Sequence, residues 1–330
     1  MLYELFRFLA TLLHAGLAFA GAPLLMGLVT KCRARLLGRR GPPLRQPYAD
    51  LRKLLAKSAM IPPMASGFYR IWPFAALAAT GAALLLVPGF SLGLLTARWS
   101  DLVTLLGLFA LSRGAAMLAG LETGSAFGGA AAAREALYGL YPTAILLAVM
   151  LVFALLTGET TINGIARSLA SGPGGLPGAL SVSAGLPVSA GLALVAMLAL
   201  ALAENGRLPA DDPAAPHELG MAREALLLEY SGRYLALFRY SACLRLMAWF
   251  CLIGTLFLPF GLARADSPLT WPLGLLCWGI KLAAFAAALA LLEVSVTRLR
   301  LFRVPGFLGA ALLLGLLSAV FLAAVERLAG

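Results

Sequence analysis

The chain has 330 residues, of which 61% are hydrophobic and 12% are charged, and its mean hydropathy is +0.90. That is more apolar surface than one soluble core hides, and the apolar residues come in blocks of about twenty, the length that crosses a bilayer as a helix. The composition excludes a soluble globular protein. It predicts an all-α, polytopic membrane protein, because helices satisfy their own backbone groups in lipid.

Eight transmembrane helices are predicted within a single integral membrane domain that covers residues 1–330. The first apolar segment lacks a cleavage site followed by a soluble domain, so we interpret it as a retained span and not as a signal peptide. The spans lie near residues 5–29, 72–95, 102–121, 137–156, 185–203, 238–262, 272–292 and 307–325.

The basic residues predict the orientation of the chain. Lys and Arg number 26 against 15 Asp and Glu, and most of them fall in or beside the loops 30–71, 122–136, 204–237 and 293–306. Such clustering follows the positive-inside rule, so these loops are expected to be cytoplasmic and both termini periplasmic in a bacterial inner membrane. The excess of positive charge therefore reflects topology and does not indicate a nucleic-acid partner. The other side carries only Arg7, Arg98, Arg167, Arg264 and Arg327.

The first cytoplasmic loop contains a predicted amphipathic helix. Pro47 suits a helix start, and Leu51, Leu54 and Leu55 recur at helical spacing beside polar Arg and Lys residues. Such a helix either anchors the loop to anionic lipid or forms the lip of a crevice that receives a partner or a lipid-soluble substrate.

The second cytoplasmic loop, within residues 120–143, is rich in glycine. Gly124, Gly128 and Gly129 are expected to let backbone segments pass closely. The loop lacks the glycine spacings of nucleotide-binding motifs and follows no strand, which argues against a phosphate site. The four cysteines, also without ligand spacing, are expected to be packing thiols, so no metal site and no catalytic residue is predicted in this chain: Cys32, Cys243, Cys251 and Cys277.

The third cytoplasmic loop, residues 204–233, concentrates acid where a span ends. Glu218 and Glu229 are eleven residues apart, about three helical turns, so they are expected to share a face from which Glu224 is turned away. The loop is either a solvated acidic face or a set of carboxylates that exchange protons. We interpret His14 as structural, while His217 lies among the acids and could titrate.

Lys281 is predicted to lie near the middle of the seventh span. A lysine there costs about 2.5–3.5 kcal/mol on insertion scales and needs a partner. The hypotheses are a buried pair with Glu122, Glu204 or Glu293 that fixes helix packing, or a proton relay.

Four ordered stretches, GPPLRQPYADLRKLLAK, LETGSAFGGAAAAREAL, ENGRLPADDPAAPHELGMAREALLLEYSGRYLAL and LRLFRVPGFLG, resemble the membrane-anchor subunit of group 4 membrane-bound nickel–iron hydrogenases, of the hydrogenase-4 component C and formate hydrogenlyase subunit 4 type. More distantly they resemble subunit 1 of respiratory complex I. The resemblance covers most of the chain. It departs from the family pattern at Pro216 and Arg223, where histidines are usual, and at Ser58, where an acid is usual.

The resemblance implies a subunit without a redox centre of its own. It implies that a nickel–iron large subunit and a small iron–sulfur subunit dock on the cytoplasmic face, and that carboxylates lead to antiporter-like membrane subunits. The implied proton-path residues are Glu122, Glu135, Glu204, Asp211, Glu218, Glu224, Glu229, Lys281 and Glu293. The implied docking residues are Arg39, Arg40, Gln46, Asp50, Lys53, Arg134, Tyr230 and Arg233.

Four functions follow as alternatives. The first is an anchor and proton-coupling subunit of an energy-converting hydrogenase. The second is a quinone-site subunit of a complex I-like enzyme, although the resemblance favours the hydrogenase branch. An independent secondary transporter lacks support because no repeat relates the two halves of the chain. A purely structural scaffold is the fourth.

Overall fold

The computed structural model describes residues 2–170, 186–211, 222–297, 299 and 303–329. Within this part of the chain, seven helical segments are long and apolar enough to cross a membrane. A shorter apolar helix covers Val188–Glu204. These helices are α1 (Leu2–Leu36), α3 (Trp72–Leu86), α4 (Leu102–Glu122), α5 (Ala126–Thr157), α8 (Leu186–Glu204), α10 (Gly232–Phe257), α11 (Trp271–Ser295) and α12 (Val304–Ala329).

Shorter elements join the long helices. They are the helices α2 (Gln46–Ala56), α6 (Ile162–Ala170) and α9 (Ala222–Leu226), the 3-10 turns η1 (Gly67–Arg70), η2 (Leu95–Trp99) and η4 (Pro268–Thr270), and the strands β1 (Ser91–Leu92) and β2 (Ala263–Arg264). The two strands pair in parallel, with Ser91 opposite Ala263. The all-α prediction is confirmed.

Several helix ends differ from the predicted spans. The second span was predicted to reach residue 95, but α3 ends at Leu86 because Pro88 and Gly89 follow. The fourth span begins at Ala126 and not at 137, since the Ser125 side chain caps the helix by accepting a hydrogen bond from the Gly128 amide, 3.1 Å away. Hydropathy alone does not mark a helix that continues past the apolar stretch.

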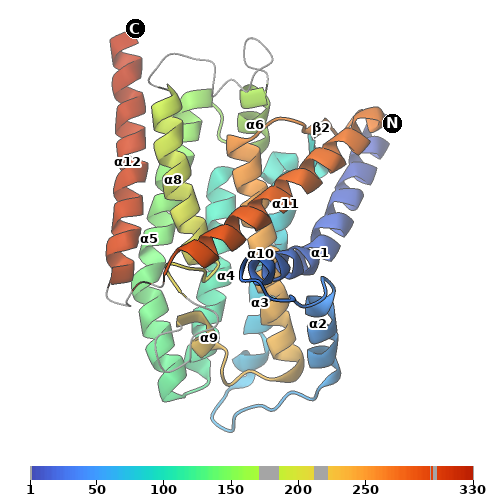
Figure 1. Ribbon diagram of the computed structural model, residues 1–330, viewed down its shortest axis with the longest axis vertical. Helices are drawn as coiled ribbons and strands as arrows, with labels where there is room; N and C mark the ends of the chain where they lie inside the picture. The colour runs from blue at the N-terminus through green and yellow to red at the C-terminus, as the bar shows by residue number, and fades with distance from the viewer. Residues whose placement is uncertain (1, 171–185, 212–221, 298, 300–302, 330) are drawn as a thin grey trace.

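The long helices form one bundle, which Figure 1 shows along its length. α12, α8 and α5 lie along one side, α1 lies on the other, and α11 crosses the bundle diagonally. The start of α1 and the end of α12 are at the same end, and α2 and α9 are at the opposite end. That arrangement matches the predicted grouping of both termini on one side and the charged loops on the other.

α10 is the central helix of the bundle. Of the most apolar 18-residue stretch of α10, 78% is buried, whereas the corresponding share for α11 is 22%. Trp249 of α10 is fully buried and stacks on Phe109 of α4 with ring centroids 5.1 Å apart. The remaining helices present part of their apolar surface outward, as expected of segments that face lipid.

α1 is interrupted by Pro23, which has no amide hydrogen to donate to the carbonyl of Phe19. The Tyr240 hydroxyl of α10 donates to that carbonyl at 3.0 Å instead. The Tyr48 hydroxyl of α2 donates to the next carbonyl, that of Ala20. The proline break is therefore the point at which α2 and α10 are attached to α1.

The loops at the α2 end are joined by an aromatic cluster. Tyr69 stacks on Tyr230 with ring centroids 4.2 Å apart and planes within 1°. The Tyr69 hydroxyl donates to the Glu229 carbonyl at 3.0 Å, and the Tyr230 hydroxyl donates to the Tyr69 carbonyl at 3.3 Å. Burial raises the pKa of the Tyr230 phenol, so it stays protonated and serves as a donor.

Gly232 lets two of these loops approach each other. Its φ is +53°, and a Cβ there would lie 2.6 Å from the Ser58 carbonyl oxygen and 2.8 Å from that of Lys57. Both conditions require glycine at this position.

We expect Gly232→Ala to destabilise the protein. The left-handed conformation and the contact with Ser58 together cost about 2 kcal/mol or more, which corresponds to a fall of roughly 3 °C or more in the melting temperature. Thermal unfolding of detergent-solubilised protein measures it. Gly38→Ala is the control, because Gly38 has φ of +70° but open space around its Cβ position; an equal loss in both variants would show that the close approach contributes nothing.

Candidate functional site

A cavity of about 640 Å³ lies at the α2 end of the bundle. Its walls come from α1, α2, α4, α5, α9, α10 and the segment that follows α8, so most of the elements at this end contribute to it. The walls combine apolar surface with charged groups. The charged side chains that line it are Arg33, Asp50, Arg113, Glu135, Arg207, Asp211, Glu224, Arg239 and Arg245.

The cavity brings together part of the predicted site. Gln46, Asp50, Glu135, Asp211 and Glu224 all line it although they come from three separate loops. The five arginines were not predicted as site residues. Arg113 carried a usable signal, because it lies inside a predicted span, where an ionisable residue is costly and points to a functional site. Arg239 and Arg245 lie inside the predicted span 238–262 and carried the same signal. Arg33 and Arg207 lie in predicted loops, where the sequence does not distinguish them from ordinary loop charge.

α2 forms one wall of this cavity, which agrees with the hypothesis that it is the lip of a crevice. Leu51 and Leu54 line the cavity and no residue of the helix is fully buried. Gln46 Nε2 donates to Asp50 Oδ1 at 2.9 Å, which ties this exposed acid to the first turn of the helix. Gly27 of α1 allows the chain at Leu44 to pass closely and so sets where α2 begins.

An ion pair between Arg113 and Glu204 ties α4 to α8. Arg113 Nη1 donates to Glu204 Oε1, and Nη2 donates to Thr143 Oγ1 of α5 at 2.9 Å. The two charged side chains are 9% and 3% exposed. Since water does not screen such a pair well, the guanidinium and the carboxylate hold three helices together.

Glu293, at the end of α11, has two arginine neighbours. Arg207 Nη1 donates to its Oε1 at 2.9 Å, and Arg33 Nη1 lies 3.6 Å from its Oε2. Arg207 follows α8 and Arg33 ends α1, so one carboxylate links three segments that are distant in sequence. Its side chain is 1% exposed.

Glu224 and Arg239 form a bidentate pair at the cavity rim. Arg239 Nη1 and Nη2 donate to the two carboxylate oxygens at 2.6 and 2.7 Å. The Arg239 side chain is 48% exposed, so this pair contributes less to stability than the buried pairs. Its parallel geometry fixes α9 on α10.

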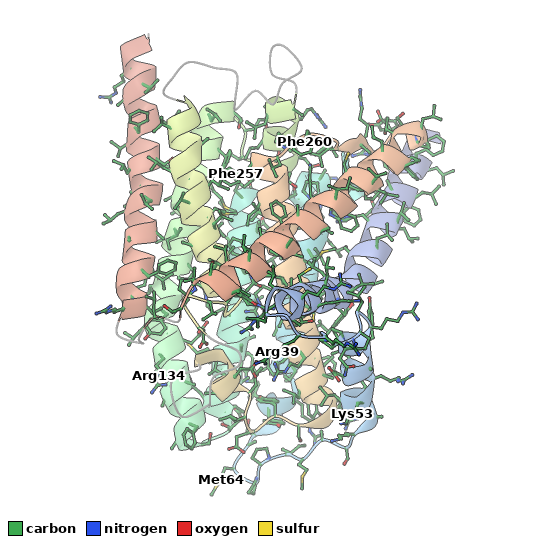
Figure 2. The ribbon with its side chains drawn as sticks, in the orientation of Figure 1. Arg39, Lys53, Met64, Arg134, Phe257 and Phe260 are labelled. Atoms are coloured by element: carbon green, nitrogen blue, oxygen red, sulfur yellow. The ribbon has the colours of Figure 1, made fainter. Side chains whose placement is uncertain are left out.

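Among the described residues Lys281 pairs with no carboxylate, so the hypothesis of a buried pair with Glu122, Glu204 or Glu293 was wrong. Its Nζ donates to the carbonyl oxygens of Leu258 and Phe260 at 2.6 and 2.5 Å and lies 4.4 Å from the centre of the Phe260 ring. Carbonyls left unpaired where α10 ends can satisfy an ammonium group as a carboxylate would. Phe260 lies at the opposite end of the bundle from Lys53 and Met64 (Figure 2), so Lys281 is remote from the cavity.

The predicted helical face of Glu218 and Glu229 lies partly outside the described residues. α9 ends at Leu226, and Glu229 is exposed in the turn that follows, where its carbonyl accepts from Tyr69. Glu218, like Asp212 and His217, lies outside the described residues. Glu122 accepts a hydrogen bond from the Ser66 amide at 2.8 Å and so joins the first two loops.

The predicted docking residues surround the cavity end. Arg39, Arg40, Lys53 and Arg233 are exposed, whereas Arg134 is half-buried. Figure 2 places Lys53 and Arg134 on opposite sides of the lower part of the molecule, with Arg39 between them. Tyr230, predicted beside them, is 2% exposed and belongs to the aromatic cluster.

His14 and two of the four cysteines are packed inside the bundle. His14 is fully buried between Phe90 and Trp278, as expected of a structural histidine. Cys243 and Cys251 are buried thiols. Within the described ranges, no three His, Cys, Asp or Glu residues gather in a way that could hold a metal ion.

Comparison with known proteins identifies the family of this chain. The model of the family described as NADH dehydrogenase matches residues 8–324. The chain belongs to that family. It is 32% identical over 290 residues to formate hydrogenlyase subunit 4 of Escherichia coli K12, covering 88% of this chain and 90% of the relative. Hydrogenase-4 component C of the same organism is 33% identical over 242 residues, covering 73% and 72%.

A solved structure shares the fold of this family member. A chain of the membrane-bound sulfane sulfur reductase, an archaeal respiratory membrane complex, superposes with a TM-score of 0.78 over 96% of this chain and 99% of that one, at 19% identity. The sequence-based resemblance is confirmed. The protein is a multi-pass, complex I-like membrane subunit. Its charged cavity is lined in part by helices that are long and apolar enough to cross a membrane.

We expect Arg113→Met in this subunit to cost about 3–5 kcal/mol, because it leaves Glu204 as an uncompensated buried charge. The double variant Arg113→Met with Glu204→Gln should recover much of that loss. Melting temperature and protein level in the membrane are the measurements. If the double variant is no more stable than the single one, the two side chains do not form the pair described.

Proposed function

We propose that the protein is the membrane-anchoring and proton-coupling subunit of an energy-converting, membrane-bound nickel–iron hydrogenase complex. One observation carries the proposal: carboxylates from separate loops converge with arginines on a single cavity, in a chain similar to membrane subunits of formate hydrogenlyase and hydrogenase-4.

The cavity has the properties that proton transfer requires. Its volume corresponds to roughly twenty water molecules at about 30 Å³ each. Glu135 and Asp211 lie on its wall, and Glu204 and Glu293 lie behind it, paired with the lining arginines Arg113 and Arg207. Apolar residues would join these helices without the desolvation cost of buried charges, so their presence favours a functional role.

The redox chemistry in this proposal belongs to partner subunits. A large subunit with the nickel–iron centre and a small iron–sulfur subunit would dock on the α2 end, where Arg39, Arg40 and Lys53 present positive charge. Antiporter-like membrane subunits would receive the protons laterally. The chain itself would bind no cofactor, and in a bacterial inner membrane its termini would face the periplasm.

We expect Glu135→Gln to leave the complex assembled while lowering proton translocation per hydrogen turned over by at least about tenfold, because the amide cannot accept and release a proton. Translocation and hydrogen turnover are measured together in inverted membrane vesicles. Asp266→Asn is the matched control, since Asp266 pairs with Arg264 at the opposite end of the bundle. Unchanged translocation in Glu135→Gln would refute the coupling role of this cavity.

A quinone-site subunit is the second candidate, favoured by the apolar part of the cavity wall. Met26, Leu51, Leu54 and Phe238 line the same space as the polar groups, an arrangement that suits an amphipathic ring.

Photoaffinity labelling of membranes with a quinone analogue separates the two candidates. In the hydrogenase function we expect no specific label on Gln46–Lys53, because the electron donor is a soluble module. Label on this segment that excess quinone suppresses would instead identify the chain as a quinone-site subunit. A variant with Leu54→Trp, which fills the cavity, controls for labelling at the protein surface.

A further inference from the structure

The two carboxylate oxygens of Glu293 are held unequally. Oε1 accepts a 2.9 Å hydrogen bond from Arg207. Oε2 is buried and accepts no hydrogen bond from any described residue, and Arg33 Nη1 lies 3.6 Å away, beyond hydrogen-bond range. A buried anionic oxygen with a nearby charge but no bond is costly to maintain.

The two arginines also differ in exposure. The Arg207 side chain is 8% exposed, and its second guanidinium nitrogen contacts Met26 Sδ, so it is enclosed. The Arg33 side chain is 29% exposed and ends α1 on the cavity wall. Arg33 is therefore the charge that can leave Glu293 without unpacking the protein.

We propose that Arg33 is a positioning residue that couples the contents of the cavity to the protonation of Glu293 Oε2. With the guanidinium turned toward Glu293, the carboxylate stays ionised. With the guanidinium turned into the cavity, Oε2 takes a proton from cavity water that is connected to the cytoplasmic phase. When Arg33 returns, Oε2 gives that proton back to the cavity water, so the position of Arg33 sets whether the carboxyl is charged. This inference rests on the proton-coupling function proposed above.

The cavity offers Arg33 a second partner. Asp50 lines the same cavity from α2, a helix without a buried residue. A carboxylate or other anionic group that enters the cavity would compete for the same guanidinium. Arg33 remains protonated throughout, since a guanidinium does not titrate in this range, so the movable quantity is its position and not its charge.

The charged groups that pair with Glu293 in the described part of the chain are Arg33 from α1 and Arg207 from the segment after α8. α10, which also packs on α11, contributes Arg239 and Arg245 to the wall of the same cavity. The contrast is Glu204: its partner Arg113 is 9% exposed and is also tied to Thr143. Glu204 is accordingly a fixed counter-ion and Glu293 the exchangeable carboxyl.

Infrared spectroscopy of the isolated complex tests the coupling directly. The carbonyl stretch of a protonated carboxyl is recorded against pH and assigned to Glu293 by its loss in Glu293→Gln. In Arg33→Gln we expect the pH of half-maximal band intensity to rise by about one unit or more, the effect of removing an opposite charge within 4–6 Å. Arg33→Lys keeps the charge, so its midpoint pH should lie between those of the unmodified protein and Arg33→Gln.

Arg35→Gln is the matched control, because Arg35 also ends α1 but is exposed and does not line the cavity. An unchanged midpoint in Arg33→Gln, an equal shift in Arg35→Gln, or no band that Glu293→Gln removes would each overturn the inference. The band reports protonation without any need for translocation. If this test fails while Glu135→Gln still lowers proton translocation as expected, the Arg33 mechanism is rejected and the proposed function stands.

Discussion

A guanidinium buried among membrane helices must have a carboxylate beside it, and the α2 end of this protein is built on that requirement. In lipid, apolar side chains gain little by leaving their surroundings for one another, so helices associate through close packing and polar contacts. Arg113 with Glu204 and Arg207 with Glu293 provide such contacts. They attach α8 and α11 to the rest of the bundle at the level of the cavity.

The two ends of the bundle are consequently held in different ways. Around α10 the packing is apolar, with Trp249 and Phe109 stacked in a fully buried core. At the α2 end, ion pairs, tyrosine hydroxyls and the close approach at Gly232 take over. The charged cavity lies at these junctions. The same charges that assemble the helices are thus the ones available for chemistry.

Much of this could be predicted from the sequence, because it depends on local pattern. Hydropathy located the helices, leucine spacing located α2, and Gly124 and Gly128 marked a close backbone turn, with φ of +63° at Gly124 and a Cβ at Gly128 only 2.5 Å from the Gly120 carbonyl oxygen. The resemblance to hydrogenase membrane subunits gave the class of protein, which the family comparison supports.

What could not be predicted depends on contacts between distant segments. Lys281 has carbonyl partners because of how the chain leaves α10, and no spacing in the sequence encodes that. Glu229 leaves the helix of Glu224 because Tyr69, far away in sequence, captures its carbonyl. The attachment of α1 has a similar origin. Tyr48 and Tyr240 hold the carbonyls in the turn before Pro23, and Met26 and Arg33 line the cavity from the part of α1 that follows. The shape of the cavity therefore depends on where α2 and α10 anchor α1.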